Sequence, residues 1–388
     1  MILFIQILPF QFHHFTLIIS FLLILSYFLI WREISIKFFQ QKKIQTPANI
    51  LLSNKSLSIV IPFRNEANRI IPLLNSIFEL NTTVNLEFIF IDDHSVDQTA
   101  KIIQNHHFFQ KFNVKLFQVA PNESGKKHAI QTGVQNANYP IILTTDADCE
   151  FQPETIDTLL LAYLQNEANF CIGPVFFQSS KSTPFLSYQK IENTSLVALG
   201  LYQFKTRKPT MANGANLMFN RSLFLKLNPF QSNQNIAGGD DIFALEAFYL
   251  HNSKKVISVA NPNAAVYTNV VDSFSEFWQQ RVRWIRKTMS QKTKNTAKSQ
   301  ILLALFFLIF WGLSLISLFQ QHYEITAILW LGKLFSDVFC IRKIFKTFNQ
   351  KTSLKEILYA SIFQNFFIPT LGVFSAFQKK VYWKSRTY

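Results

Sequence analysis

The chain has 388 residues, a formal net charge of +15 and a hydrophobic content of 49%. This length suits one soluble domain together with several membrane segments. The positive charge has three candidate partners: nucleic acid, anionic lipid and phosphate-bearing substrates. No zinc-finger spacing or other nucleic-acid-binding signature is present, so nucleic acid is excluded from the expected partners. The three cysteines are odd in number and far apart, which predicts buried thiols rather than a disulfide framework or a metal cluster.

Residues 1–34 form a predicted N-terminal membrane anchor. The first 31 residues contain no Asp, Glu, Lys or Arg, and the part from about Phe15 to Trp31 is long enough to span a bilayer. A cleavable signal peptide would need basic residues at its start and a small-residue cleavage site, and the segment has neither. We therefore expect a permanent anchor whose N-terminus lies outside the cytosol.

Basic residues flank the apolar segments on one side only. They follow the first segment and precede the second, at Arg32, Lys37, Lys42, Lys43, Lys292, Lys294 and Lys298. Basic flanks of this kind mark the cytosolic side of a membrane protein. The region between the two groups is therefore expected in the cytosol, next to anionic lipid.

Residues 50–272 alternate short apolar runs with amphipathic stretches. The apolar runs are typical of buried strands and lie at 57–61, 86–91, 114–119 and 141–145. Helical spacing occupies the intervening stretches 68–80, 97–107 and 126–136. This alternation predicts an α/β fold built from βαβ units around a mostly parallel sheet. Ligands of such sheets bind at the carboxyl ends of the strands, which is where the charged motifs of this chain occur.

Polar residues follow the first two predicted strands. Pro62, Arg64 and Glu66 come directly after the first strand, and Asp93 comes after the second. A carboxylate at a strand end can accept hydrogen bonds from a base or a ribose. Helix capping by Ser95 or Asp97 is an alternative interpretation, and both interpretations can hold together.

A glycine and a pair of lysines open the third predicted helix. A Gly125 turn, a helix N-terminus and the Lys126 ammonium together favour a bound phosphate group. A surface lysine pair at the start of a helix explains the same pattern equally well.

Asp146 and Asp148 follow the fourth predicted strand directly. Residues two positions apart on an extended strand point the same way, so these two carboxylates are expected on one side. Paired oxygen ligands suit Mg²⁺ or Mn²⁺, whose remaining positions would be filled by water and phosphate oxygens. An isolated Asp-x-Asp pattern is common by chance, but its place at the end of a buried strand favours a metal site.

Two more groups of candidate residues lie further along the chain. Asp240 and Asp241 precede a predicted helix, where one of them could cap the helix and both could supply a general base. Residues 273–299 are predicted to form an amphipathic interfacial helix with basic residues towards lipid headgroups. That role does not by itself require the side chains of Gln280, Arg283 and Trp284.

Residues 300–388 form a predicted C-terminal membrane region. The uncharged stretch Ile301–Gln320 is a second spanning segment, and Ile325–Ile341 can return through the membrane if Lys333 and Asp337 pair at i,i+4.

The last apolar stretch, Ile357–Gln378, has two open interpretations. It either spans the membrane, which places the basic tail outside against the charge rule, or breaks at Pro369 and Gly372 into a re-entrant hairpin. The hairpin would return the tail to the cytosol.

Taken in order, these motifs resemble the family 2 glycosyltransferases over about Leu57 to Trp284. The resembling segments are SIVIPFRNE, IDDHSVDQT, GKKHAIQTG, TDAD, GGDD and QRVRW. His94 departs from the pattern, since the family usually has glycine there. The resemblance implies inverting enzymes with a GT-A fold, which is a nucleotide-sugar-binding α/β domain with a mostly parallel mixed sheet.

The resemblance also implies roles for individual residues. Asp93 would bind the base or ribose, Asp148 would hold Mg²⁺ or Mn²⁺ on the donor diphosphate, and Asp241, beside Asp240, would be the catalytic base. The remaining donor- and substrate-binding positions implied by the motifs are Pro62, Arg64, Glu66, Lys126, Asp146, Gln280, Arg283 and Trp284.

The expected function is a multi-pass enzyme of the inner or plasma membrane with a cytosolic catalytic domain. It would move a sugar from a nucleotide-diphosphate sugar, with uridine diphosphate as the expected nucleotide, to a lipid, lipid-linked or glycan acceptor. A processive β-polysaccharide synthase is an alternative, although this chain has few membrane segments for that class. A catalytically inactive nucleotide-sugar-binding membrane protein is a second alternative, against which the intact Asp148, Asp241 and Trp284 argue.

Overall fold

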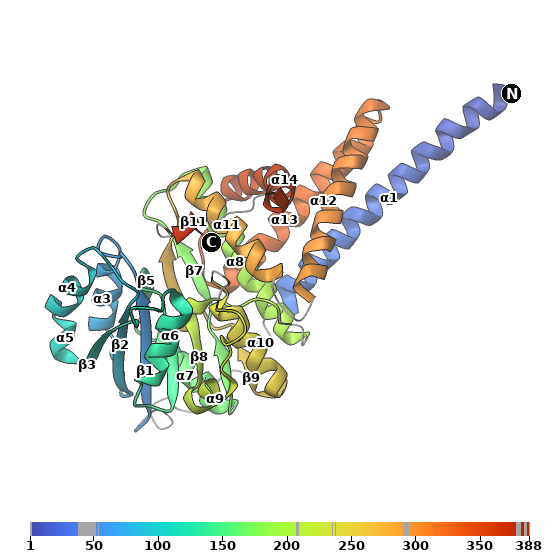
Figure 1. Ribbon diagram of the computed structural model, residues 1–388. Coiled ribbons are helices and arrows are strands. Elements are labelled where there is room, and N and C mark those ends of the chain that lie inside the picture. Colours follow the sequence, from blue (N-terminus) through green and yellow to red (C-terminus); the bar gives the residue numbers. More distant parts are fainter. Residues whose placement is uncertain are drawn as a thin grey trace.

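The computed structural model describes residues 2–37, 52, 54–206, 209–234, 236, 238–289, 295–377, 382–383 and 386–387. An α/β domain occupies one end of the molecule, and the N-terminal and C-terminal helices stand together at the other (Figure 1). Of the basic residues named above, Lys42, Lys43, Lys292 and Lys294 lie outside the described residues, and so do Lys379, Lys380 and Lys384 of the basic tail.

The core of the α/β domain is a seven-stranded sheet with the order β3-β2-β1-β4-β8-β6-β9. The first four strands are parallel, β8 runs antiparallel to both of its neighbours, and β6 and β9 are parallel. The expected mostly parallel mixed sheet is therefore confirmed. The strands are β1 (Ser56–Phe63), β2 (Asn85–Asp92), β3 (Asn113–Gln118), β4 (Ile141–Thr144), β6 (Phe170–Ile172), β8 (Leu217–Asn220) and β9 (Val256–Ser258).

Helices cover both faces of this sheet, which explains why the central strands are continuous apolar runs. Along β1, Ile59 and Ile61 belong to one core and Val60 to the core on the opposite face. The first core is closed by α3 (Ile71–Phe78), α4 (Thr99–Asn105), α5 (Phe108–Lys111) and α7 (Thr155–Gln165). The second core is closed by α6 (Lys126–Gln135), α9 (Arg221–Leu227) and α10 (Asp240–Asn252).

A second, three-stranded sheet lies beside the first and has the order β5-β10-β7. It consists of β5 (Cys149–Phe151), β7 (Val175–Gln178) and β10 (Val266–Asn269). Three short 3-10 helices complete the domain: η1 (Gly214–Asn216), η2 (Ser253–Lys255) and η3 (Pro262–Ala264). All three cysteines are buried and free, as the sequence predicts.

Four helices form what we call the helical bundle: α1 (Ile2–Lys37), α12 (Asn295–Phe319), α13 (Tyr323–Thr347) and α14 (Leu354–Phe377). Three stretches of it are long and apolar enough to cross a membrane, namely His13–Ile36, Ile301–Phe319 and Leu354–Ser375. Two helices join the bundle to the α/β domain: α8 (Pro184–Lys205), which packs against α1, α13 and α14, and α11 (Phe274–Met289), which packs against α12 and α14. The short strands β11 (Tyr382–Trp383) and β12 (Arg386–Thr387) follow the bundle.

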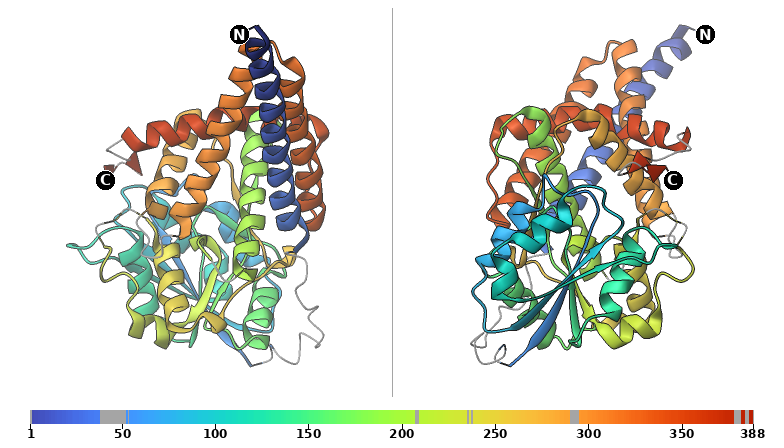
Figure 2. Two further views of the ribbon diagram at one scale, coloured as in Figure 1. Left: turned by 90° about the vertical axis from the view of Figure 1, so that its right-hand side faces the viewer. Right: turned by 60° about the vertical axis from the view of Figure 1, so that its left-hand side comes forward.

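The structure does not have the hairpin break in the last apolar stretch. The helix α14 continues through Pro369, and it runs across the upright α1 and α12 rather than alongside them (Figure 2). Proline removes the hydrogen bond to the carbonyl four residues earlier, which here belongs to Asn365. The indole N–H of Trp311 donates to that carbonyl at 2.9 Å, so the backbone carbonyl that the proline leaves free keeps a hydrogen bond.

Candidate active site

A cleft of about 350 Å³ opens beside the carboxyl ends of β1 and β4 and is roofed by α8 and α11. Every residue that the sequence singled out for chemistry lines it, although these residues span more than 200 positions of the chain. They are Pro62, Arg64, Glu66, Asp93, Lys126, Asp146, Asp148, Asp240, Asp241, Gln280, Arg283 and Trp284. Asp148 and Asp241, the proposed metal ligand and base, therefore share one cavity.

One end of the cleft is built from the loops after β1 and β2. Asp93 is 3% exposed, its carboxylate accepts from the Gly125 amide at 2.8 Å, and its carbonyl accepts from Arg64 at 2.8 Å. The capping alternative is not what the structure has at α4, whose N-cap position is Gln98 without a side-chain cap, although Asp97 accepts from the amide of Thr99 at 3.0 Å. Asp93 is thus held by three segments and presented to the cavity.

His94, the departure from the family pattern, has a φ of 57°. This is the left-handed region that favours glycine. The imidazole Nε2 lies 2.9 Å from the carbonyl of Glu123, so the side chain turns away to the next loop. His94 therefore has the backbone conformation of a glycine position, and it differs from glycine only in its side chain.

The two aspartates after β4 meet through a turn rather than along an extended strand. The strand ends at Thr144, and the amide of Cys149 donates to the carbonyl of Asp146 at 3.2 Å to close the turn. We expected the two residues on an extended strand with their side chains on one side, and this geometry was wrong. Both carboxylates nevertheless line the cleft. Their side chains are 32% and 35% exposed, which leaves oxygen atoms open to a ligand.

Lys126 is surrounded by carboxylates. Its Nζ lies 2.6 Å from Asp146 Oδ1 and 3.3 Å from Asp240 Oδ2. Burial alone would lower the pKa of Lys126, but the charges of Asp146, Asp240 and Asp241 outweigh it and raise this pKa. The lysine is therefore a permanent cation at the N-terminus of α6.

Negative charge nevertheless exceeds positive charge at this end of the cleft. Burial and the neighbouring charges of Asp148 and Asp240 raise the pKa of Asp146, against the opposing effect of Lys126. Burial also lowers the pKa of Arg283, while the four aspartates act in the opposite direction. A cluster of carboxylate oxygens with surplus negative charge is a chemical fit for a hard divalent cation.

Glycines shape the segment that carries Asp240 and Asp241. Gly238 and Gly239 have φ values of 70° and 76°, and α10 begins immediately after them. The helix has no side-chain cap, so the capping alternative for these two residues is not what the structure has. Both carboxylates are buried in its first turn, where the helix dipole favours negative charge.

Gly214 makes room for the ion pair from the opposite side. A Cβ atom there would lie 2.5 Å from Asp240 Oδ2 and 3.0 Å from Lys126 Nζ. Gly214 begins η1, which leads directly into β8. Its structural reason is the close approach of a lysine and an aspartate that are distant in sequence.

Arg281 is a site residue that the sequence interpretation missed. It is 2% exposed, its Nε donates to Glu192 of α8 at 3.0 Å, and its guanidinium carbon lies 4.4 Å from the Trp284 ring centroid. It also donates to the side-chain oxygen of Gln280. Arg281 therefore fixes two of the predicted residues and joins α11 to α8.

The wall formed by α8 was missed as well. Leu196, Val197, Leu201 and Phe204 recur at helical spacing along it and line the cleft, together with Phe177 of β7. The spacing was a readable signal for a helix, but nothing in it showed which face would meet the cavity. The cleft therefore has a carboxylate-rich end and an apolar side that continues towards the helical bundle.

Comparisons with known proteins agree with this architecture. Residues 58–227 match the model of the family described as "Glycosyl transferase family 2". The solved structure of a mannosyltransferase from Pyrobaculum calidifontis in complex with GDP-Man and Mn²⁺ is similar in fold, with a TM-score of 0.53 and 16% sequence identity over 90% of this chain and 96% of that chain. These findings show a GT-A-like α/β fold and support a family 2 glycosyltransferase for the matched part of the chain.

Curated relatives overlap with parts of the chain. A protein of Sulfolobus acidocaldarius named "Probable glycosyltransferase" is 25% identical over 71% of this chain and 59% of its own length. A dolichol-phosphate mannosyltransferase of Pyrococcus furiosus is 26% identical over 37% of this chain and 40% of its own length. A 4,4'-diaponeurosporenoate glycosyltransferase of Staphylococcus aureus is 34% identical over 30% of both chains. The chain thus spans less than two thirds of the length of these relatives.

Proposed function

We propose that this chain is a membrane-bound inverting glycosyltransferase that moves a sugar from a nucleotide-diphosphate sugar to a hydroxyl of a lipid or lipid-linked acceptor. The observation that carries the proposal is the cleft itself, in which a nucleotide-facing loop, a carboxylate cluster and an apolar wall adjoin. The proposed location is the inner or plasma membrane, with several passes and the α/β domain in the cytosol.

The donor is assigned to the carboxylate-rich end. Asp93, with Pro62, Arg64 and Glu66 around it, would receive the nucleoside, and uridine diphosphate is the expected nucleotide. The similar mannosyltransferase structure holds GDP-Man, so guanosine diphosphate sugars belong in the test as well. The Lys126 ammonium and the Arg283 guanidinium face the position of the diphosphate and would offset its charge.

Asp148, with Asp146 beside it, would hold Mg²⁺ or Mn²⁺. The cleft fits such an ion because its four aspartates supply oxygen ligands and their negative charge exceeds the positive charge of Lys126 and Arg283. When bound, such an ion stabilises negative charge on a leaving diphosphate.

The base is assigned to Asp241. Asp240 already lies 3.3 Å from Lys126 Nζ, so we assign it to positioning that lysine. The Asp241 carboxylate takes the proton of the acceptor hydroxyl, and the acceptor oxygen forms a bond to the anomeric carbon. The bond from that carbon to the diphosphate oxygen breaks, and the diphosphate leaves with the electron pair. A single displacement of this kind inverts the anomeric configuration.

The acceptor is assigned to the apolar side. Leu196, Leu201 and Phe204 form an apolar surface that the chain of a lipid acceptor would bury. A sugar or peptide acceptor would not need such a surface. Two relatives bear names that contain such compounds, dolichol phosphate and 4,4'-diaponeurosporenoate. Gln280 and Trp284, on the neighbouring α11, would contact the sugar and the acceptor head.

A panel of labelled uridine- and guanosine-diphosphate sugars, incubated with membranes that contain the protein, tests this function. We expect one donor to label material that partitions into organic solvent. Asp241→Asn should lower transfer by about 10²–10⁴-fold, the usual contribution of a general base, and leave nucleotide binding unchanged. Full activity of this variant would exclude Asp241 as the base. Label in a long polymer would favour a processive synthase instead.

A further inference from the structure

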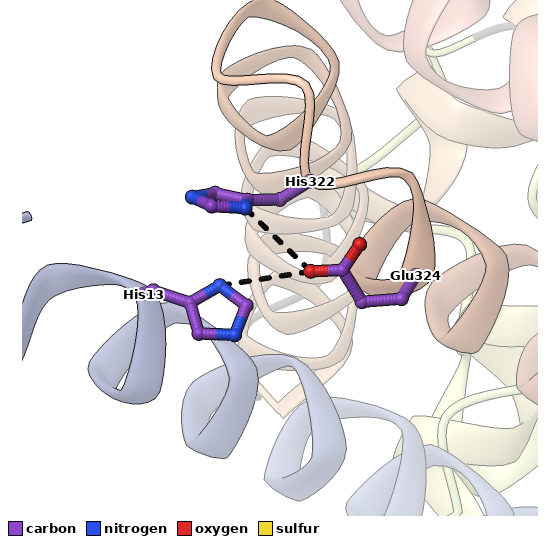
Figure 3. A group of neighbouring side chains, drawn as sticks. All are labelled: His13, His322 and Glu324. Atoms are coloured by element: carbon purple, nitrogen blue, oxygen red, sulfur yellow. Dashed lines mark ion pairs between the residues drawn. The ribbon is translucent and has the colours of Figure 1, made fainter. Parts of the chain in front are cut away.

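A second group of metal-ligating side chains lies far from the cleft, at the end of the helical bundle that points away from the sheet. His13 comes from α1, and His322 and Glu324 come from the turn that enters α13 (Figure 3). We call these three residues the His–Glu cluster. It borders two of the membrane-crossing candidates, because one begins at His13 and another ends at Phe319.

The spacing of the cluster fits one shared ion. Nδ1 of His13 and Nδ1 of His322 each lie 3.6 Å from Oε1 of Glu324, and all three ligand atoms lie within 4.8 Å of one another. A separation of 3.6 Å is too long for a hydrogen bond. Two ligands on a tetrahedral Zn²⁺, each about 2.0–2.1 Å from the metal, are about 3.4 Å apart. The observed separations are therefore close to the edges of a metal-centred tetrahedron.

The His13 ring supplies an independent observation. Its Nδ1 is buried and has no hydrogen-bond partner among the described residues, although it faces Glu324. A buried polar atom without a hydrogen bond is destabilising, so native structures seldom keep one without a purpose. A metal ion between the imidazoles and the carboxylate satisfies this atom.

The turn that presents His322 is rigid. Gln321 has a φ of 61° and reverses the chain, and the amide of His322 donates to the carbonyl of Ser317 at 2.8 Å. The hydroxyls of Ser317 and Thr326 lie 2.6 Å apart and join the two helices below the turn. The backbone that carries these two ligands is thus held by hydrogen bonds that need no ion, which favours a preorganised site.

We propose that the His–Glu cluster binds a divalent ion of the Zn²⁺ class and thereby fastens α1 to the turn between α12 and α13. Two imidazole nitrogens and one carboxylate oxygen suit Zn²⁺ better than Mg²⁺, and water would complete the coordination. The residues proposed to hold a metal ion in the cleft are carboxylates, so the two sites should select different metals. This inference does not depend on the proposed sugar transfer.

The test uses untagged full-length protein in lipid nanodiscs, stripped of metal with a chelator. The Asp146→Asn and Asp148→Asn substitutions serve as the parent background, because they remove the two carboxylates proposed to hold the metal ion in the cleft. Bound zinc per chain and the thermal unfolding midpoint are measured during a ZnCl₂ titration. We expect about one Zn²⁺ per chain and a rise in the midpoint, because binding to the folded state alone stabilises it. MgCl₂ should produce neither effect.

His13→Ala, His322→Ala and Glu324→Gln should each weaken zinc binding by at least about tenfold. Glu324 is 56% exposed, so its conservative variant is expected to fold even if a histidine variant does not. His251→Ala, at an exposed position on α10, is the matched control and should bind zinc like the parent. Absence of zinc binding, or binding that persists in Glu324→Gln and His322→Ala, would overturn the proposal. No readout involves sugar transfer, so failure here leaves the proposed function standing.

Discussion

The cleft and the helical bundle each contain a lysine 2.6 Å from an aspartate, but the two pairs have different surroundings. In the bundle, Lys333 and Asp337 are 1% and 4% exposed. In the cleft, Lys126 and Asp146 are 18% and 32% exposed. One pair is sealed and the other is open to solvent.

The bundle pair is also satisfied in charge and in hydrogen bonds. Asp337 Oδ1 accepts from the Tyr27 hydroxyl at 2.7 Å, and its Oδ2 accepts from Gln364 at 3.0 Å. Lys333 donates to the carbonyl of Ser361 at 3.1 Å. One cation meets one anion, and α1, α13 and α14 each contribute a partner. Such a network holds helices together and leaves nothing for a ligand.

In the cleft, one lysine faces several carboxylates, and two of them remain partly exposed. An arrangement with unbalanced charge and open oxygen atoms is costly unless something binds to it. The comparison teaches that a buried or half-buried ion pair indicates a functional site only when its charges and hydrogen bonds are left incomplete. Substitutions at the two lysines should therefore have opposite consequences for stability and activity.

The largest effect on stability is expected in the bundle. Lys333→Met leaves the carboxylate of Asp337 buried without its cation, which should lower the free energy of unfolding by about 3–5 kcal/mol. Chemical denaturation in detergent measures the loss. The double variant Lys333→Met/Asp337→Leu removes both charges and should recover most of the stability. Equal stability of the single variant and the native protein would show that the pair is not structural.

Substitution of the cleft lysine should affect activity more than stability. Lys126→Met removes the cation that faces the diphosphate and should lower sugar transfer by about 10²–10³-fold. The unfolding midpoint should fall less than in Lys333→Met, because Asp146 is partly exposed and can be screened by water and ions, even though Asp240 is buried. Lys126→Arg keeps the charge and should recover part of the activity. A variant that is strongly destabilised yet active would contradict the distinction drawn between the two pairs.

A third ionised group, Glu87, extends the comparison to the sheet. It is fully buried, and it accepts from Ser58, from the amide of Asn138 and from Lys115 at 2.9 Å. Burial alone would raise the pKa of Glu87, but the bonds from Ser58, Lys115 and Asn138 outweigh burial and lower it. We expect Glu87→Gln to destabilise the protein by about 1–3 kcal/mol at pH 7 without a specific effect on catalysis.

The pH dependence of that effect follows from the sign of the shift. Because the pKa of Glu87 is lower in the folded than in the unfolded state, its stabilisation is fully present above the unfolded value, near 4.5. It is lost as the pH falls through the folded value. Unfolding midpoints of the native protein and Glu87→Gln, measured from pH 7 downwards, should therefore converge in acid. A gap that widens below pH 4.5 would show that the carboxylate is not stabilised by these partners.

The sequence predicted more of the cleft's polar end than of its apolar side. Polar motifs at strand ends follow from the topology of parallel sheets, so Asp93 and Asp148 could be assigned to one edge before any coordinates were known. Asp241 precedes a helix, and only the family resemblance placed it with them. The roles of these residues remain predictions. The apolar wall of α8 and the buried Arg281 depend on contacts between segments far apart in sequence, which local patterns do not encode.

Two geometric expectations failed for different reasons. Asp146 and Asp148 meet through a turn because β4 ends before them, and strand ends are the least certain feature of a sequence pattern. The helix α14 passes Pro369 unbroken because Trp311, on another helix, satisfies the Asn365 carbonyl. A local turn decides the first conformation, and a contact between two helices decides the second.

Binding of nucleoside diphosphates by calorimetry tests the central claim most directly, namely that the open carboxylate cluster is a cation-dependent donor site. The native protein should bind uridine or guanosine diphosphate in the presence of Mn²⁺ or Mg²⁺ and lose this binding with a chelator. Asp148→Asn should weaken it by at least about tenfold even with the metal present. Binding that is indifferent to both the chelator and the Asp148 substitution, or no binding of either nucleotide, would contradict the account.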